Sequence, residues 1–220
     1  MASLTIENYV KAIYQISAGA GGGATSTGKL AEALGVSPGT VTSMLKTLGE
    51  SGLAEYVPYE GARLTDAGRI LALRVLRRHR LIELFLVRTL DLSWDEVHEE
   101  AENMEHAVSD LLIDRIDAFL GHPATDPHGD PIPKADGTVA GTSGRRLSQL
   151  AVGQRFRVVR VLEQTPEFLR YLTETGLKLD ATGTVAANRS ESGTITVQVA
   201  GQSTTLAHDV ADRLLVTDKG

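Results

Sequence analysis

The stretch KLAEALGVSPGTVTSMLKTLGESG, residues 29–52, decides the fold of the N-terminal part of the chain. A short helix is expected from residue 29 until Gly35 ends it. Ser37 followed by Pro38 is typical of a new helix start, because a serine hydroxyl caps the first turn and proline suits its first position. The second helix is expected to run to about residue 50 and to bury Val41, Met44, Leu45 and Leu48. Two helices joined by a glycine-containing turn predict a helix-turn-helix unit.

The segments on either side of this unit predict a winged helix-turn-helix. Residues 4–16 have the apolar spacing of a helix, and residues 53–57 and 62–64 look like two strands around a turn at 58–61. In this arrangement the second helix enters the DNA major groove. The polar positions suited to phosphate and base-edge contacts are Ser37, Thr40, Thr42, Ser43 and Lys46 on the helix, with Tyr59 and Arg63 on the wing. The alternative interpretation is a helical packing unit with no role in DNA binding.

Charge is segregated along the chain, although the net charge is only −6. Residues 1–90 carry ten Lys and Arg against seven Asp and Glu, whereas residues 91–120 carry one against ten. A mildly basic module followed by a strongly acidic segment is compatible with a nucleic-acid partner despite the negative total.

The composition indicates the cellular compartment of the protein and limits the ligand types that a metal could use. The sequence contains no run of about 18 to 20 apolar residues and no signal-peptide pattern at its start. It also contains no cysteine, so a metal would have to be bound by oxygen and nitrogen alone. We therefore expect a cytoplasmic protein with no membrane partner.

The acidic segment includes His-Glu-Glu-Ala-Glu-Asn-Met-Glu-His at residues 98–106. Ser93 and Glu96 form a capping-box pattern, which predicts one helix from about residue 93 to residue 119. Such a helix would place residues 98, 102, 105 and 106 on one face. The preceding helix, expected over 65–89, presents His79 and Glu83 one turn apart. Imidazole and carboxylate ligands at this spacing predict one six-ligand metal site or two smaller sites, with a solvated charged face as the alternative.

From residue 121 onward the sequence no longer has the apolar spacing of long helices. Residues 121–146 are rich in proline and glycine and indicate a linker. Strands are expected at 155–162, 183–187, 194–199 and 214–216, with one helix at 166–175, which suggests a small barrel. The fold class is therefore mostly α with a small β domain. The three remaining histidines are interpreted as ordinary surface residues: His122, His128 and His208.

Two enzyme-like motifs are rejected or kept only as alternatives. Residues 23–29 match most of a phosphate-binding loop, but Leu30 stands where a metal-binding hydroxyl is needed, and a helix precedes the loop instead of a strand. Glu102-x-x-Glu105-His106 is similar to an inverted zinc-peptidase signature whose first histidine is replaced. A metallohydrolase therefore remains an alternative function, as does a metal-storage or metal-delivery protein without DNA binding.

Several motifs together resemble the diphtheria toxin repressor family of metal-dependent transcriptional regulators, including its manganese-responsive branch. They are Glu7-x-Tyr9 with Ile13-Tyr14, Arg78-His79-Arg80-Leu81, the 98–106 block and Asp130-Pro131-Ile132-Pro133. The resemblance implies a DNA-binding domain at 1–70, a helical metal-binding and dimerisation domain at 71–121, a linker at 122–146 and an SH3-like, FeoA-like domain at 147–220. It also implies a homodimer that binds operator DNA when metal-bound. No catalytic residues and no small-molecule substrate are expected.

The resemblance further implies two metal sites. The primary site would use Asn8, Glu102, Glu105 and His106, and the ancillary site would use His79, Glu83, His98, Gln164 and Glu167. Position 102 is cysteine in the iron-responsive members and glutamate here, as in the manganese branch, so Mn(II) is expected, with Fe(II) as the alternative. Asn8 is neither the methionine nor the aspartate of those two branches. Asp126 and Asp130 stand where some relatives bind an anion beside an arginine, and here they are expected to pair with Arg80 directly.

Overall fold

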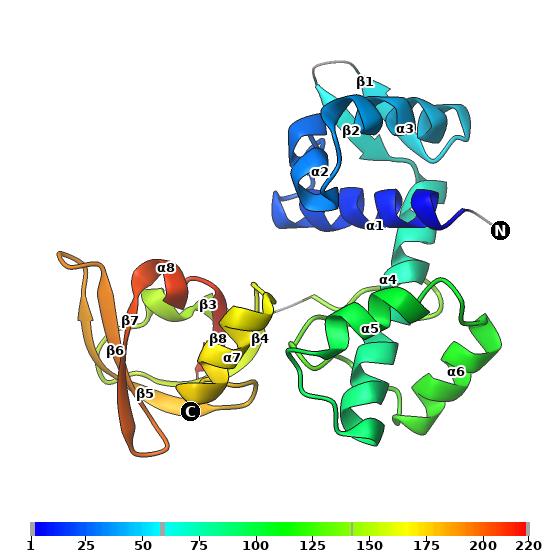
Figure 1. The fold of residues 1–220 in the computed structure, drawn as a ribbon. Helices are drawn as coiled ribbons and strands as arrows, with labels where there is room; N and C mark the ends of the chain where they lie inside the picture. Colours follow the sequence, from blue (N-terminus) through cyan, green and yellow to red (C-terminus); the bar gives the residue numbers. More distant parts are fainter. Residues whose placement is uncertain (1–2, 58–59, 142, 219–220) are drawn as a thin grey trace. The chain divides into compact units, whose positions relative to one another are not determined.

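The computed structural model describes residues 3–57, 60–141 and 143–218, and these residues form two compact units. The first unit contains the chain up to His79 together with Met104–Val108 and Pro133–Thr138. The second contains Arg80–Asn103, Ser109–Ile132 and the chain from Val139 onward. Helices dominate the N-terminal half and strands the C-terminal part, so the mostly α fold with a small β domain is confirmed (Figure 1).

The first unit contains a helix-turn-helix followed by a two-stranded wing. Its elements are α1 (Leu4–Gly19), α2 (Thr27–Leu34), α3 (Pro38–Glu50), β1 (Ala54–Val57) and β2 (Gly61–Leu64). Gly35 ends α2 in the left-handed conformation, and the Ser37 hydroxyl caps α3 by accepting a hydrogen bond from the Thr40 amide at 3.2 Å. Strands β1 and β2 pair antiparallel. The predicted winged arrangement is confirmed, although Pro58 and Tyr59 of the expected turn lie outside the described residues.

The acidic segment forms two helices instead of the single helix predicted, so that prediction is wrong. Helix α5 (Val97–Met104) ends before Glu105, and α6 (Asp110–Phe119) begins after a separate cap, in which the Ser109 hydroxyl accepts a hydrogen bond from the Leu112 amide at 3.3 Å. Residues 105–107 form a turn and residue 108 a bend between the two helices. The preceding helix α4 (Asp66–Leu90) runs unbroken. Among the described residues, no helix is both long and apolar enough to cross a membrane.

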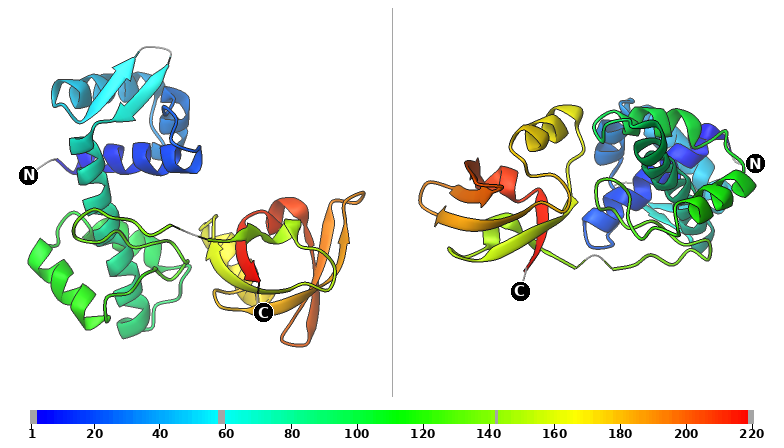
Figure 2. Two further views of the ribbon diagram at one scale, coloured as in Figure 1. Left: turned by 180° about the vertical axis from the view of Figure 1, so that it is seen from behind. Right: turned by 90° about the horizontal axis from the view of Figure 1, so that it is seen from below.

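The C-terminal part of the second unit is an antiparallel six-stranded sheet in the order β3-β8-β4-β5-β6-β7. Figure 2 shows its strands from two further sides. The strands are β3 (Arg145–Arg146), β4 (Arg155–Val161), β5 (Thr182–Arg189), β6 (Thr194–Val199), β7 (Gln202–Ala207) and β8 (Leu214–Asp218). The short helices are η1 (Leu147–Gln149), α7 (Pro166–Glu174) and α8 (His208–Ala211). Phe156, Leu169 and Val197 lie in a buried core, against which Trp94 also packs.

Part of the predicted linker is folded against β4. The His128 carbonyl accepts a hydrogen bond from the Val161 amide at 2.9 Å, and the Asp126 amide donates to the Asp130 carbonyl at 3.0 Å. Gly129 has a φ of 86°, and a Cβ atom there would collide with the carbonyl oxygen of Val159. Only glycine therefore allows the chain to approach β4 so closely.

Candidate metal centre and nucleic-acid interface

Glu105 is a fully buried carboxylate held by three side chains of the first unit. One oxygen, Oε1, lies 2.6 Å from Lys11 Nζ and 3.2 Å from His106 Nε2, while Oε2 lies 2.6 Å from His79 Nδ1. Burial alone would raise the pKa of Glu105, but hydrogen bonds and charges from His79 and Lys11 outweigh it and lower the pKa below its usual value. The carboxylate is therefore ionised at neutral pH.

Helix α1 contacts this region through two residues one turn apart: Lys11 contacts the Glu105 carboxylate, and Glu7 contacts the His106 imidazole. Glu7 Oε2 lies 2.7 Å from His106 Nδ1, and both side chains are largely buried. Asn8, the expected ligand from α1, is only partly buried, and the α1 contacts to Glu105 and His106 come from its neighbours. The structure thus brings together Glu7, Lys11, Glu105 and His106.

Glu102, the fourth expected primary ligand, belongs to α5 and to the second unit. Its side chain is 53% exposed, and its Oε1 is 3.7 Å from His98 Nε2 one turn earlier on α5. Helix α5 ends at Met104, so Glu102 lies within the helix, whereas Glu105 and His106 belong to the turn that follows.

A second group of candidate ligands surrounds the buried Glu83. His98 Nδ1 lies 3.3 Å from Glu83 Oε1, and His79 precedes Glu83 by one turn on α4. On the other oxygen, His128 Nδ1 lies 3.8 Å from Glu83 Oε2 and 4.0 Å from Asp126 Oδ1. Each of the groups His79–Glu83–His98 and Glu83–Asp126–His128 offers ligand atoms within 4.8 Å of one another. Glu83 is common to both.

His128 corrects the sequence interpretation, because it is wholly buried and not an ordinary surface residue. Its Nε2 lies 2.7 Å from the Trp94 carbonyl oxygen, to which only a protonated nitrogen can donate. In the neutral ring Nδ1 is then an unprotonated acceptor, and within the described part of the chain it has no hydrogen-bond partner. The burial was missed because it arises from packing on β4, although Gly129 was a signal of a close approach.

The electrostatics around His128 favour a cation. Burial, followed by the charges of Asp130 and Glu83, raises the pKa of Asp126 well above its usual value, and Arg80 only partly opposes this. Two buried carboxylates beside an orphaned imidazole nitrogen form a donor set that fits a divalent metal ion. Glu105 with its neighbouring imidazoles fits the same class of ion.

Arg80 pairs directly with both linker carboxylates, as expected from the sequence. Its guanidinium lies 3.6 Å from Asp126 Oδ2 and 3.4 Å from Asp130 Oδ2. Asp130 also pairs with Arg160 and accepts a hydrogen bond from Gln164 Nε2 at 3.1 Å. Gln164 is thus held by Asp130.

Glu167, the other ligand expected from the barrel, is 80% exposed and pairs with Arg170 at 3.4 Å.

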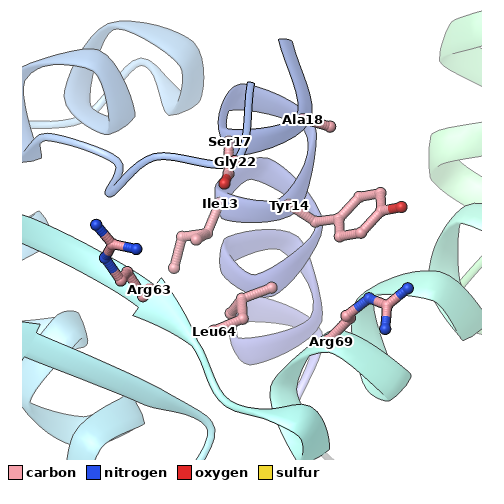
Figure 3. Close-up of a pocket in the computed structure, with 8 residues that line it drawn as sticks. All are labelled: Ile13, Tyr14, Ser17, Ala18, Gly22, Arg63, Leu64 and Arg69. Carbon is pink, nitrogen blue, oxygen red and sulfur yellow. The ribbon is translucent and has the colours of Figure 1, made fainter. Parts of the chain in front are cut away.

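The predicted DNA-contacting residues form a polar face on α3. Ser37, Thr40, Ser43 and Lys46 are exposed, while the half-buried Thr42 donates its hydroxyl hydrogen to the Pro38 carbonyl at 2.9 Å. Arg63 of β2 borders a cavity of about 320 Å³ between α1, β2 and the start of α4. Figure 3 shows the guanidinium groups of Arg63 and Arg69 on opposite sides of this cavity. Exposed hydroxyl and basic groups of this kind suit phosphate contacts.

Three family descriptions match the chain in succession. "Iron dependent repressor, N-terminal DNA binding domain" matches residues 1–62, and "Iron dependent repressor, metal binding and dimerisation domain" matches residues 65–134. "FeoA domain" matches residues 145–218.

Similar proteins span almost the entire chain. The iron-dependent repressor IdeR of Mycobacterium tuberculosis is 31% identical over 225 residues, covering 96% of each chain. The diphtheria toxin repressor of Corynebacterium glutamicum is 30% identical, covering 96% of this chain and 95% of that protein. A solved structure of a manganese-dependent transcriptional repressor in complex with manganese is 41% identical, with a TM-score of 0.86 and coverage of 97% and 100%.

Proposed function

The chain belongs to the iron-dependent repressor family of metal-dependent transcriptional regulators, and we propose that manganese(II) activates its DNA binding. It is a DNA-binding regulator with an SH3-like FeoA domain and not an enzyme. The metallohydrolase and storage alternatives lose their support. Because the partner is operator DNA, we place the protein in the cytoplasm.

The observation that carries the choice of manganese is the buried donor set Glu83–Asp126–His128, which consists of two carboxylates and one imidazole nitrogen. Mn(II) accepts such hard ligands, and the sequence offers no thiolate that would favour softer ions. Glu102 stands where the iron-responsive branch has cysteine. The manganese-complexed structure at 41% identity supports the same choice, and Fe(II) is the second candidate.

The residue assignments divide the ligands between two sites. We keep Asn8, Glu102, Glu105 and His106 for the primary site and add Glu7, which already contacts His106. For the ancillary site we keep His79, Glu83 and His98. There, the buried pair Asp126 and His128 takes the place of Gln164 and Glu167, because these two contact Asp130 and Arg170 instead.

Helix α1 links the proposed primary metal site to the helix-turn-helix. Glu7 and Lys11 connect α1 to the turn that holds Glu105 and His106, and α1 packs against α2 of the helix-turn-helix. A divalent ion bound at the primary site supplies a positive charge to which several carboxylates are attracted. The α1 side chains then fix the helix-turn-helix relative to that turn. Metal and operator DNA are therefore expected to tighten each other's binding reciprocally.

The dimer sets the spacing of the two recognition helices. Helix α6 exposes Leu111 and Phe119, each 70% exposed, and Phe119 contacts Phe85 of α4 edge to face. We propose that this apolar surface contributes to the homodimer, so that two α3 helices meet half-sites about one DNA turn, or a multiple of it, apart.

Duplexes selected from a random pool by the manganese-loaded protein provide the test. Affinity is expected to be about 5- to 150-fold higher with Mn(II) or Fe(II) than in chelator-treated protein. Fluorescence anisotropy at fixed salt measures it, since phosphate contacts make affinity salt-dependent. Equal affinities under all three conditions would contradict the metal switch.

Replacing His128 by alanine is expected to remove one of two manganese equivalents per chain, because the buried acceptor nitrogen is lost. Isothermal titration of Mn(II) measures the stoichiometry. His122→Ala is the matched control, since the His122 side chain is 74% exposed and pairs with Asp117. Retention of both equivalents in the His128 variant would remove His128 from the ancillary site.

A further inference from the structure

Lys11 is a buried cation in the middle of α1. Its side chain is 9% exposed, and its ammonium nitrogen lies 2.6 Å from Oε1 of Glu105, which is itself fully buried. Burying an ammonium group is costly unless a charged or hydrogen-bonding partner compensates it. The protein therefore neutralises the central carboxylate of the proposed primary site with a positive charge of its own.

The ammonium group and a metal ion compete for the same oxygen. Carboxylate oxygens lie ~2.0–2.2 Å from a bound metal such as zinc, which is shorter than the 2.6 Å from Glu105 Oε1 to Lys11 Nζ. The other oxygen, Oε2, is engaged by His79. A divalent ion on Oε1 would thus lie against the Lys11 ammonium and would be repelled by it.

We propose that Lys11 is an internal competitor of the activating metal and sets the metal concentration at which the protein responds. The Lys11 ammonium holds α1 to Glu105 until a divalent ion takes its position. This inference rests on the proposed primary site. It adds that the metal concentration needed for activation depends on Lys11, which is not a ligand. It also adds that the bound metal replaces the Lys11–Glu105 ion pair as a connection between α1 and the primary site.

The test is Lys11→Met, which keeps the apolar stem and removes the charge. Titration with Mn(II), followed by the electron paramagnetic resonance signal of the free ion, is expected to show binding at least tenfold tighter at one site. The second site serves as an internal reference and should not change. Lys29→Met is the matched control, because Lys29 is an exposed lysine of α2 and its loss removes the same charge.

Thermal unfolding distinguishes two cases: the metal displaces the Lys11 ammonium from Glu105, or the ammonium stays in place and only repels the metal. The Lys11→Met variant is expected to have a lower Tm than the parent chain in chelator and an equal Tm at saturating Mn(II). A Tm loss of equal size under both conditions would mean that Lys11 stays in place beside the metal, which would overturn the proposal. Unchanged or weaker metal affinity would also overturn it.

If the Lys11→Met variant does not fold, two other measurements test the proposal. The first is the same Mn(II) titration with Lys11→Gln, which removes the charge but can still hydrogen-bond. In the unaltered chain, the nitrogen-15 signal of the Lys11 ammonium should be protected from exchange in chelator and should lose that protection on addition of Zn(II). Persistence of the protected signal in the zinc-bound chain would overturn the proposal. By contrast, an unaltered chain that binds no divalent ion would refute the proposed primary site itself.

Discussion

Replacing Glu105 by glutamine is expected to weaken manganese binding at the primary site by about 100-fold or more and to abolish the metal dependence of DNA binding. The carboxylate is fully buried and contacts Lys11, His79 and His106. Glutamine preserves the shape but removes the negative charge that attracts the ion. Manganese titration and anisotropy with the selected duplex measure the two effects.

The same substitution should also destabilise the protein in chelator. Removing one partner of a buried ion pair typically costs about 3–5 kcal/mol, because the remaining charge stays buried without compensation; here the Lys11 ammonium would lose the Glu105 carboxylate. Glu100→Gln is the matched control, since Glu100 is exposed on α5. A Glu105 variant with the manganese affinity and urea stability of the parent would show that this carboxylate is no ligand.

Gly129→Ala is expected to lower the free energy of unfolding by about 2–3 kcal/mol and to eliminate manganese binding at the ancillary site. The added Cβ would collide with the Val159 carbonyl oxygen, so the chain would have to move away from β4. That movement would break the hydrogen bond from the Val161 amide to His128 and would shift the imidazole away from Glu83.

Gly121→Ala separates the collision from backbone strain. Gly121 has a φ of 77°, close to that of Gly129, but a Cβ atom there would meet no heavy atom within 4 Å. Its substitution should therefore cost only the strain of the left-handed conformation and leave both manganese equivalents bound. Equal losses in the two variants, measured by urea unfolding and titration, would contradict the role assigned to the approach on β4.

The winged helix was predictable because its signals are local. Ser37 with Pro38 starts α3 and Gly35 ends α2, and neither depends on distant parts of the chain. The residue types of the candidate metal centre were also visible in the sequence. Their division was not, because the expected helical face required α5 to continue through Glu105, whereas the chain turns there and Ser109 starts α6. The Ser109 cap was visible in the sequence and was overlooked.

The role of residues 126–130 could not be read from periodicity. A proline- and glycine-rich segment indicates a linker, and nothing local shows that Asp126 and His128 are buried. Their burial follows from long-range contacts, with Arg80 of α4 on one side and β4 on the other. Likewise, the choice of Glu7 over Asn8 as the partner of His106 depends on how α1 lies on the turn at 105–108, which helical spacing does not specify.

The sequence has a single tryptophan, and its place gives the protein a built-in optical reporter. The Trp94 indole is stacked on the His128 imidazole with 6.0 Å between ring centroids, and its backbone carbonyl accepts the hydrogen bond from His128. All indole emission therefore originates beside the Glu83 group. Paramagnetic manganese bound there should quench it, whereas diamagnetic zinc should only shift its wavelength. Occupancy of this one site can thus be followed by light in unlabelled protein.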